Sequence, residues 1–388
     1  VADLPTGACF QQSLDRDGGR IAIADGAAPS ATVVDVDSGA TLFAVGEPGY
    51  VRDVAFSPDG RWIATTNGND AVHVSVAATG ETRFTVSAHT SWVNALAWSP
   101  TGDRLATVSE DGTAAISAVE ESGVDTYLSL SGEATGNGLY SISFSPEGDR
   151  VLTGDSGLES VKVWDVSDAG GAEWANYGDV WPFLPPTFLP DGRRLAAVAG
   201  DRQGVVIHDV DDPDGGRRIG RPPAPGSQIS GYSVSGDGAL VAVAWDESRV
   251  QIWDLDTGSV RTTVTSDVVG PFVGALAWTS DGRHLAVAGG DDEQVWVSVV
   301  DRAGVEVARL QESQGDAVEG IATLSFGAHD RLLSQTVYAE RDLATVMGVR
   351  VWDWEQEELI QTVRTPSVVA RFDPTSNRVV ALRMLEGD

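Results

Sequence analysis

The stretch Val54-Ala55-Phe56-Ser57-Pro58-Asp59-Gly60-Arg61-Trp62-Ile63 decides the fold of this 388-residue chain, because its pattern returns along the whole sequence. Pro58 presets φ, Asp59 accepts hydrogen bonds from the backbone and Gly60 tolerates the left-handed conformation, so this turn predicts a hairpin loop. Ser99-Pro100-Thr101-Gly102 and Ser145-Pro146-Glu147-Gly148 repeat the same chemistry. Each turn is expected to join a first short strand to a second.

The turn residue recurs every 42 to 48 positions, which is the period of four short strands with their loops. It stands at Gly18, Gly60, Gly102, Gly148, Gly192, Gly238, Gly282, Asp330 and Ser376. A branched apolar residue follows three positions later each time, at Ile21, Ile63, Leu105, Val151, Leu195, Val241, Leu285, Leu333 and Val379. Small residues such as Ala55 and Ala97 stand five positions before the turn, as the narrow inner edge of a radially packed sheet requires.

A second hairpin follows in most units, marked by aspartate-rich turns such as Asp254-Leu255-Asp256-Thr257-Gly258. Each unit is therefore a four-stranded antiparallel sheet with two apolar faces, which a closed ring of sheets would bury. The predicted fold is an all-β propeller with eight blades. The alternative is a seven-bladed ring whose surplus units begin a second propeller.

We predict a single propeller domain over residues 1–388. Its units lie near residues 8–46, 50–87, 92–130, 138–178, 182–222, 228–266, 272–311 and 319–364, with a half unit at 366–388. The severed last repeat and the missing initiator Met suggest a piece of a longer chain that carries other domains.

Three stretches resemble the WD-repeat (WD40) family: Val163-Trp164-Asp165-Val166, Ile252-Trp253-Asp254-Leu255 and Val351-Trp352-Asp353-Trp354. The resemblance implies a hydrogen-bonded set of His, Ser or Thr, Asp and Trp in each repeat. The residues that match this set are His89, Ser109 and Asp111 in the third unit, together with Trp164, Asp165, Trp253, Asp254, Trp352 and Asp353. No unit carries the full set, since Ser117 stands at the Trp position of the third, so we expect degenerate repeats that depend on packing.

The charge of the chain is strongly acidic, with 57 Asp and Glu against 26 Lys and Arg and a net charge of −31. Such a chain repels phosphate backbones, so we expect no nucleic-acid partner. Compositional bias explains the charge, and steering of a basic partner is the alternative. No apolar run is long enough to predict a membrane span, and the single Cys9 favours a cytoplasmic location.

Catalytic motifs are weak in this sequence. Gly154-Asp155-Ser156-Gly157 resembles a protease nucleophile segment, but the five histidines lie in different units. Asp209-Val210-Asp211-Asp212-Pro213-Asp214-Gly215 departs from a calcium loop because Pro213 occupies a ligand position. We therefore predict no cofactor, no metal and no enzymatic activity.

Aromatic and Arg residues gather where the chain enters each innermost strand, at one rim of the expected ring. They are Tyr50, Arg52, Trp92, Asn94, Tyr140, Trp181 and Phe272. These residue types dominate binding hot spots, so we predict a scaffold that binds a protein or peptide at this rim. The alternatives are that the aromatics only cover the adjoining blade, that a small ligand is turned over at the axis by a hydrolase or lyase, or that the ring is a structural spacer.

Overall fold

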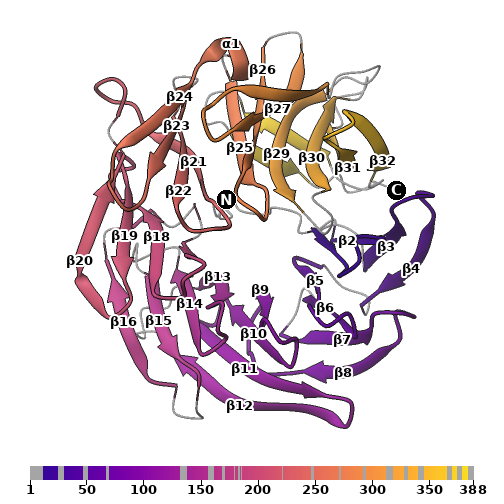
Figure 1. Cartoon of the computed structure of the whole chain (residues 1–388). Coiled ribbons are helices and arrows are strands. Elements are labelled where there is room, and N and C mark those ends of the chain that lie inside the picture. Colours follow the sequence, from indigo (N-terminus) through magenta and orange to yellow (C-terminus); the bar gives the residue numbers. More distant parts are fainter. Residues whose placement is uncertain are drawn as a thin grey trace.

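Eight four-stranded antiparallel sheets stand around a common axis in the computed structural model, so the chain is an eight-bladed β-propeller (Figure 1). The structure describes residues 12–24, 30–46, 51–66, 70–131, 138–155, 161–167, 171–178, 180–181, 184, 186–220, 222–245, 249–270, 272–291, 294–311, 318–326, 331–339, 345–364, 369–373 and 378–382. Four consecutive strands form each blade, from the axis outward. The prediction of an all-β propeller with eight blades is confirmed.

The strands of blades 1 to 4 are β1 (Gln12–Leu14), β2 (Arg20–Ile23), β3 (Ala31–Asp35), β4 (Thr41–Val45), β5 (Val54–Phe56), β6 (Trp62–Thr66), β7 (Val72–Val76), β8 (Thr82–Val86), β9 (Val93–Trp98), β10 (Arg104–Ser109), β11 (Thr113–Glu120), β12 (Gly123–Ser131), β13 (Leu139–Phe144), β14 (Arg150–Asp155), β15 (Val161–Asp165) and β16 (Glu173–Tyr177).

The strands of blades 5 to 8 are β17 (Thr187–Phe188), β18 (Arg194–Val198), β19 (Val205–Asp209), β20 (Asp212–Ile219), β21 (Ile229–Val234), β22 (Leu240–Trp245), β23 (Arg249–Asp254), β24 (Val260–Val264), β25 (Phe272–Trp278), β26 (His284–Gly290), β27 (Val295–Asp301), β28 (Glu306–Gln311), β29 (Val318–Phe326), β30 (Leu332–Ala339), β31 (Thr345–Asp353) and β32 (Glu358–Arg364). A four-residue helix, α1 (Ser266–Val269), precedes blade 7, and β33 (Val369–Asp373) with β34 (Arg378–Leu382) forms a separate two-stranded sheet after blade 8. No described helix is long and apolar enough to cross a membrane.

The recurring turn is held by a hydroxyl and a carboxylate. In blade 2 the backbone N–H of Trp62 donates to Ser57 Oγ at 2.9 Å, and Ser57 Oγ donates to Asp59 Oδ1 at 2.6 Å. Burial works to raise the pKa of Asp59, but the hydrogen bonds from Ser57 and Arg61 outweigh it and lower that pKa. Gly60 has a φ of 76°, the left-handed conformation that the turn requires.

Packing between blades supplies the core. The described residues form eight apolar clusters, each of which joins two neighbouring blades. The column three positions after each turn is fully or almost fully buried in these clusters from Ile21 to Leu333. Since a single twisted sheet cannot shield both of its faces, burial at these seams stabilises the ring as a whole.

The ring closes directly between blade 8 and blade 1. Leu333 and Val351 of blade 8 pack with Ile21 and Val34 of blade 1. Arg331 crosses the same seam and donates from Nη1 to the carbonyl oxygen of Gly18 at 3.0 Å. Closure between these two blades excludes the seven-bladed alternative, and β33–β34 stands outside the eight blades.

The polar set implied by the family resemblance is formed only in part, and its Trp–hydroxyl bond is present in blades 4 and 8. The indole N–H of Trp164 donates to Thr153 Oγ1 at 2.9 Å, and that of Trp352 donates to Ser334 Oγ at 3.0 Å. In blade 6 the equivalent position on the second strand is Val243, and the buried indole N–H of Trp253 has no hydrogen-bond partner among the described residues. Asp165, Asp254 and Asp353 bond within their own β-turns, for example Asp254 with Thr257 at 2.8 Å.

Candidate functional site

Arg52 contacts both Trp92 and Asn94 across the seam between blades 2 and 3, so three of the predicted rim residues meet there. Arg52 precedes the inner strand β5, Trp92 precedes β9, Asn94 lies in β9 and Tyr140 lies in β13. The guanidinium of Arg52 lies over the indole of Trp92, with Cζ 4.2 Å from the ring centroid. Trp92 is 39% exposed, and it is the only large apolar side chain of the described inner-strand entries that is so exposed.

Glu110 completes this cluster, although the sequence did not single it out. It accepts from Arg52 Nη1 at 2.9 Å, while the same Nη1 also donates to Asn94 Oδ1. Asn94 Nδ2 in turn donates to the carbonyl oxygen of Leu139 at 2.8 Å, next to Tyr140. We call Arg52, Trp92, Asn94 and Glu110 the rim cluster.

The family-type polar set of blade 3 positions the rim cluster. Glu110 follows Ser109 and precedes Asp111, in the turn between β10 and β11. Ser109 Oγ donates to the carbonyl oxygen of Ser91 at 3.1 Å, and Asp111 Oδ2 accepts from the backbone N–H of Thr90 at 2.8 Å. These bonds tie the turn to the loop that carries Trp92. The backbone N–H of Glu110 also donates to the carbonyl oxygen of Trp92 at 2.9 Å.

His89 anchors that loop from below. Its Nε2 lies 2.8 Å from Thr107 Oγ1, its Nδ1 lies 3.0 Å from Thr113 Oγ1, and Asp111 Oδ2 lies 3.4 Å from Nδ1. Burial lowers the pKa of His89, and Asp111 offsets this only in part. The ring is therefore neutral at pH 7, with both nitrogens engaged. Ser117, at the Trp position of this blade, instead bonds Thr126 at 2.8 Å.

A buried carboxylate lies directly next to the rim cluster in the chain. Asp53 is almost fully buried, and its Oδ2 accepts from the backbone N–H of Leu96 in the neighbouring blade at 2.9 Å. Burial raises the pKa of Asp53 to about 6, against the opposing effect of the N–H groups of Leu96 and Val54. Asp53 thus links blades 2 and 3 beneath Arg52.

Trp181 belongs to a second group above blades 5 and 6. Arg202 Cζ lies 4.9 Å from its ring centroid, and Arg202 donates to the carbonyl oxygen of Ile229 at 2.8 Å and to Gln228 Oε1 at 2.7 Å. Trp181 is half-buried against the apolar cluster of blades 5 and 6. Here the aromatic packs against the apolar seam between blades 5 and 6. Phe272 begins β25, but its side chain lies outside the described part of the structure, and Tyr50 lies outside it altogether.

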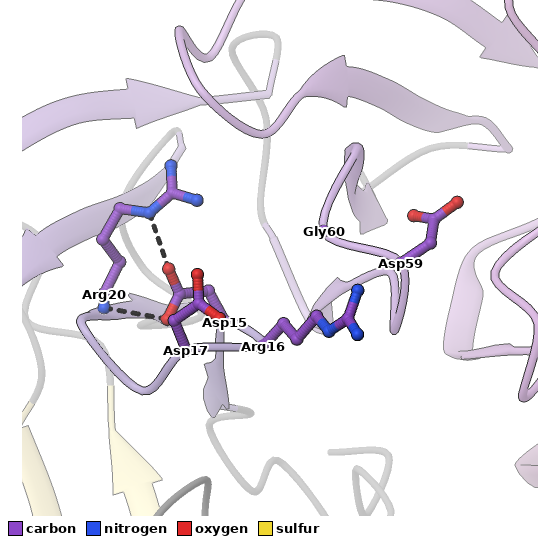
Figure 2. A pocket seen from close by; sticks show the side chains of 6 residues that line it. All are labelled: Asp15, Arg16, Asp17, Arg20, Asp59 and Gly60. Carbon is purple, nitrogen blue, oxygen red and sulfur yellow. Dashed lines mark hydrogen bonds and ion pairs between the residues drawn. The ribbon is translucent and has the colours of Figure 1, made fainter.

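The opposite face of the ring holds a cavity of about 310 Å³ between the first turns of blades 1 and 2. Figure 2 shows Asp15 and Arg20 on one side, Asp59 and Gly60 on the other and Arg16 extending between them. Asp15 accepts from Arg20 Nε at 2.8 Å, and Arg20 continues to the carbonyl oxygen of Ala77 in blade 2. Arg20, paired with Asp15 inside blade 1, therefore bridges the seam to blade 2 through the carbonyl oxygen of Ala77.

The protease-like and calcium-loop-like motifs of the sequence are described only in part. Within those ranges no three His, Cys, Asp or Glu side chains lie together in a metal-binding arrangement. Asp155 ends β14, while Ser156 and Gly157 of the protease-like segment lie outside the described residues. Asp209 and Asp212 flank the β19–β20 turn, where Asp209 Oδ1 accepts from the backbone N–H of Asp211 at 2.9 Å.

Three stretches of the chain match the family model of the WD domain, G-beta repeat: residues 40–74, 80–116 and 126–165. Each match runs from the outer strand of one blade to the third strand of the next. The three together contain the described residues of the rim cluster, so this site lies in the part of the ring where the repeats are most regular.

Curated relatives share the same repeat. WD repeat-containing protein 1 of Gallus gallus is 28% identical over 178 residues, which is 45% of this chain and 28% of that protein. WD repeat-containing protein SL1-17 of Schistosoma mansoni is 32% identical over 123 residues, 32% of this chain and 39% of that protein. Eukaryotic translation initiation factor 3 subunit I of Candida albicans is 27% identical over 181 residues, 42% of this chain and 48% of that protein.

The chain spans less than half the length of each of these relatives. What the matches have in common is the repeat, which the family model detects at residues 40–74, 80–116 and 126–165. The chain is an eight-bladed β-propeller that carries WD repeats in these three stretches and is similar to WD repeat-containing proteins.

Proposed function

We propose that this propeller is a non-catalytic interaction scaffold that binds a protein or peptide at the rim cluster. WD40 propellers in general fit an interaction role, and two of the three relatives named above are WD repeat-containing proteins. The proposal rests on the exposure and the contacts of Trp92. Its side chain is 39% exposed, while Arg52 packs on its ring and the backbone N–H of Glu110 holds its carbonyl oxygen. An aromatic ring held rigid and open loses little entropy on binding, which is the property of a hot spot.

The charge of the chain narrows the class of partner. With a net charge of −31, the surface disfavours nucleic acid and other polyanions. Glu110 is 32% exposed beside Trp92, so the site itself offers a carboxylate to an incoming group. A protein or peptide segment therefore fits the rim cluster better than a phosphate-bearing ligand.

Affinity capture from the source cell with native protein and Trp92→Ala variant tests this proposal. The matched control is Trp174→Ala, since Trp174 is 45% exposed on the outer strand β16 of blade 4, away from the rim. We expect a set of proteins that is captured by the native chain and the control but lost with Trp92→Ala. Equal capture by all three proteins would refute binding at the rim cluster and favour the interpretation as a structural spacer. Turnover of a small substrate by the purified chain would refute the non-catalytic function and favour an enzyme.

A further inference from the structure

We propose that Arg52 is an intramolecular stand-in for an arginine side chain of the partner, which binds by displacing it from the rim cluster. This rests on the proposed function and specifies the chemistry of the same site. The occupant is thus a guanidinium group on a protein or peptide segment. In the unbound ring, blade 2 supplies that group to a receptor formed by blade 3.

The surroundings of Arg52 form a guanidinium receptor. Trp92 offers an aromatic face at 4.2 Å, Glu110 a carboxylate oxygen at 2.9 Å and Asn94 an amide oxygen. An aromatic face with a carboxylate and a further acceptor in reach matches the planar, delocalised charge and multiple N–H donors of guanidinium. All three receptor groups come from blade 3, whereas the guanidinium comes from blade 2.

The receptor does not depend on Arg52 for its shape. Trp92 and Glu110 are joined to each other by a backbone hydrogen bond, and Asn94 Nδ2 bonds the carbonyl oxygen of Leu139. Blades 3 and 4 therefore keep the backbone of Trp92 and Glu110 and the side chain of Asn94 in position when the guanidinium leaves, so a ligand meets a site whose framework is preorganised.

The Arg52 side chain can leave without disturbing blade 2. Its backbone N–H donates to Thr66 Oγ1 at 3.1 Å, and the N–H of Asp53 donates to the same hydroxyl at 2.9 Å. The chain entry is thus anchored at Thr66 independently of the guanidinium. Arg52 is also 29% exposed, so its displaced side chain reaches solvent directly. Its salt bridge to a partly exposed Glu110 is of the weak, surface kind.

A titration with small peptides tests the exchange. The probe is an acetylated tripeptide amide with a central arginine, and its matched counterparts carry citrulline or lysine at that place. Binding is measured by calorimetry or by NMR chemical shifts of the Trp92 indole. We expect Arg52→Ala to bind the arginine peptide about tenfold more tightly than the native chain, because an internal competitor that fills the site nine-tenths of the time weakens apparent affinity by about that factor.

Control variants separate this mechanism from a general change in the fold. Arg202→Ala removes the guanidinium over Trp181 and should leave peptide affinity unchanged. Glu110→Gln in the Arg52→Ala background should lose most of the gained affinity, and the citrulline peptide should bind at least tenfold more weakly than the arginine peptide. If thermal denaturation shows that Arg52→Ala does not fold, Arg52→Gln is measured instead, and the same gain in affinity for the arginine peptide is expected.

Weaker or unchanged binding of the arginine peptide to folded Arg52→Ala or Arg52→Gln overturns the inference and makes Arg52 part of the binding surface. Equal binding of the citrulline and arginine peptides also overturns the inference. Tighter binding of the lysine peptide than of the arginine peptide overturns it as well, because the site would then select an ammonium group. If Trp92→Ala no longer captures the proteins but Arg52→Ala binds the arginine peptide no more tightly than the native chain, the displacement of Arg52 is refuted. The proposed scaffold function is then still supported. If Trp92→Ala loses none of the captured proteins, the proposed function fails independently.

Discussion

Two Arg–Trp pairs lie on the same rim of this propeller and differ in what holds them. Arg52 lies over Trp92 at 4.2 Å and is bonded by side chains, Asn94 and Glu110. Arg202 lies over Trp181 at 4.9 Å and donates to the backbone carbonyl oxygen of Ile229 as well as to Gln228 Oε1. Trp92 is exposed, whereas Trp181 packs into the seam between blades 5 and 6.

The same two residue types, Arg and Trp, therefore lie in two different environments on one rim. Arg202 reaches the backbone of the next blade, and Trp181 beside it covers apolar surface. Arg52 has only side-chain acceptors for its guanidinium among the described residues, and Trp92 beside it is exposed. On the proposed function, we expect this environment, rather than the presence of Arg and Trp, to separate a binding pair from a structural pair.

Replacing each of the two tryptophans by alanine should give the largest difference between the two pairs, measured as the free energy of unfolding. Trp181→Ala should lower the free energy of unfolding by about 3 kcal/mol, since it removes a large ring from an apolar seam. Trp92→Ala should lower it by less than about 1 kcal/mol, because surface substitutions cost little. Urea denaturation of the two variants beside the native chain measures both values, and equal costs would mean that Trp92 is also a packing residue.

Replacement of the buried carboxylate near Arg52 should give the next largest effect. The pKa of Asp53 is about 6 in the folded chain, above its ordinary value of 3.8. Above pH 6 the ionised group therefore destabilises the fold, by about 2–3 kcal/mol for a shift of about two units. As pH falls from 6 to 4 this penalty disappears.

Asp53→Asn keeps an oxygen for the N–H of Leu96 and removes the charge. It should raise the free energy of unfolding at pH 8 and leave it nearly unchanged at pH 4. Denaturation at both pH values, with the exposed Asp125→Asn as control, tests the sign. A variant that is less stable at pH 8 would show that Asp53 is stabilising when charged.

An intermediate effect is expected when the support of the rim cluster is removed. Asp111→Ala should cost about 2 kcal/mol, because it removes the acceptor for Thr90 and Thr113 and the partner of His89. Asp254→Ala, which removes only the local bonds of an exposed carboxylate to Thr257, should cost clearly less than Asp111→Ala.

The Asp111→Ala variant should also lose proteins captured through Trp92, since the turn carrying Glu110 is no longer tied to the Trp92 loop. Asp254→Ala should keep them. Retention of capture by folded Asp111→Ala would show that the rim cluster does not need the polar set of blade 3 for its position.

The smallest effect distinguishes the two guanidinium groups. Arg202→Gln should cost about 1 kcal/mol, because it removes a charged donor from the carbonyl oxygen of Ile229. Arg52→Gln should change the free energy of unfolding by about 0.5 kcal/mol or less, as expected for a partly exposed ion pair. Thermal denaturation of both variants measures the two losses of stability. A larger loss for Arg52→Gln than for Arg202→Gln would contradict the proposal that Arg52 can be displaced.

The fold was accessible from the sequence because its determinants are local and repeated. A hydroxyl, a carboxylate and a left-handed residue build each turn within a few positions, as at Ser57, Asp59 and Gly60. The branched residue three positions later is buried in every described blade, from Ile21 to Leu333. Such a unit leaves two apolar faces open, so its repetition alone determined a closed ring of stacked sheets.

Only the tertiary structure decided which rim residues act together. Arg52, Glu110 and Leu139 belong to three consecutive blades, and their contacts depend on how those blades are rotated about the axis. The same geometry places Trp181 in a seam and Trp92 in the open, although both precede an inner strand. Side-chain contacts across blades carry no periodic signal in the sequence, because they join positions some 40 to 60 residues apart that differ from repeat to repeat.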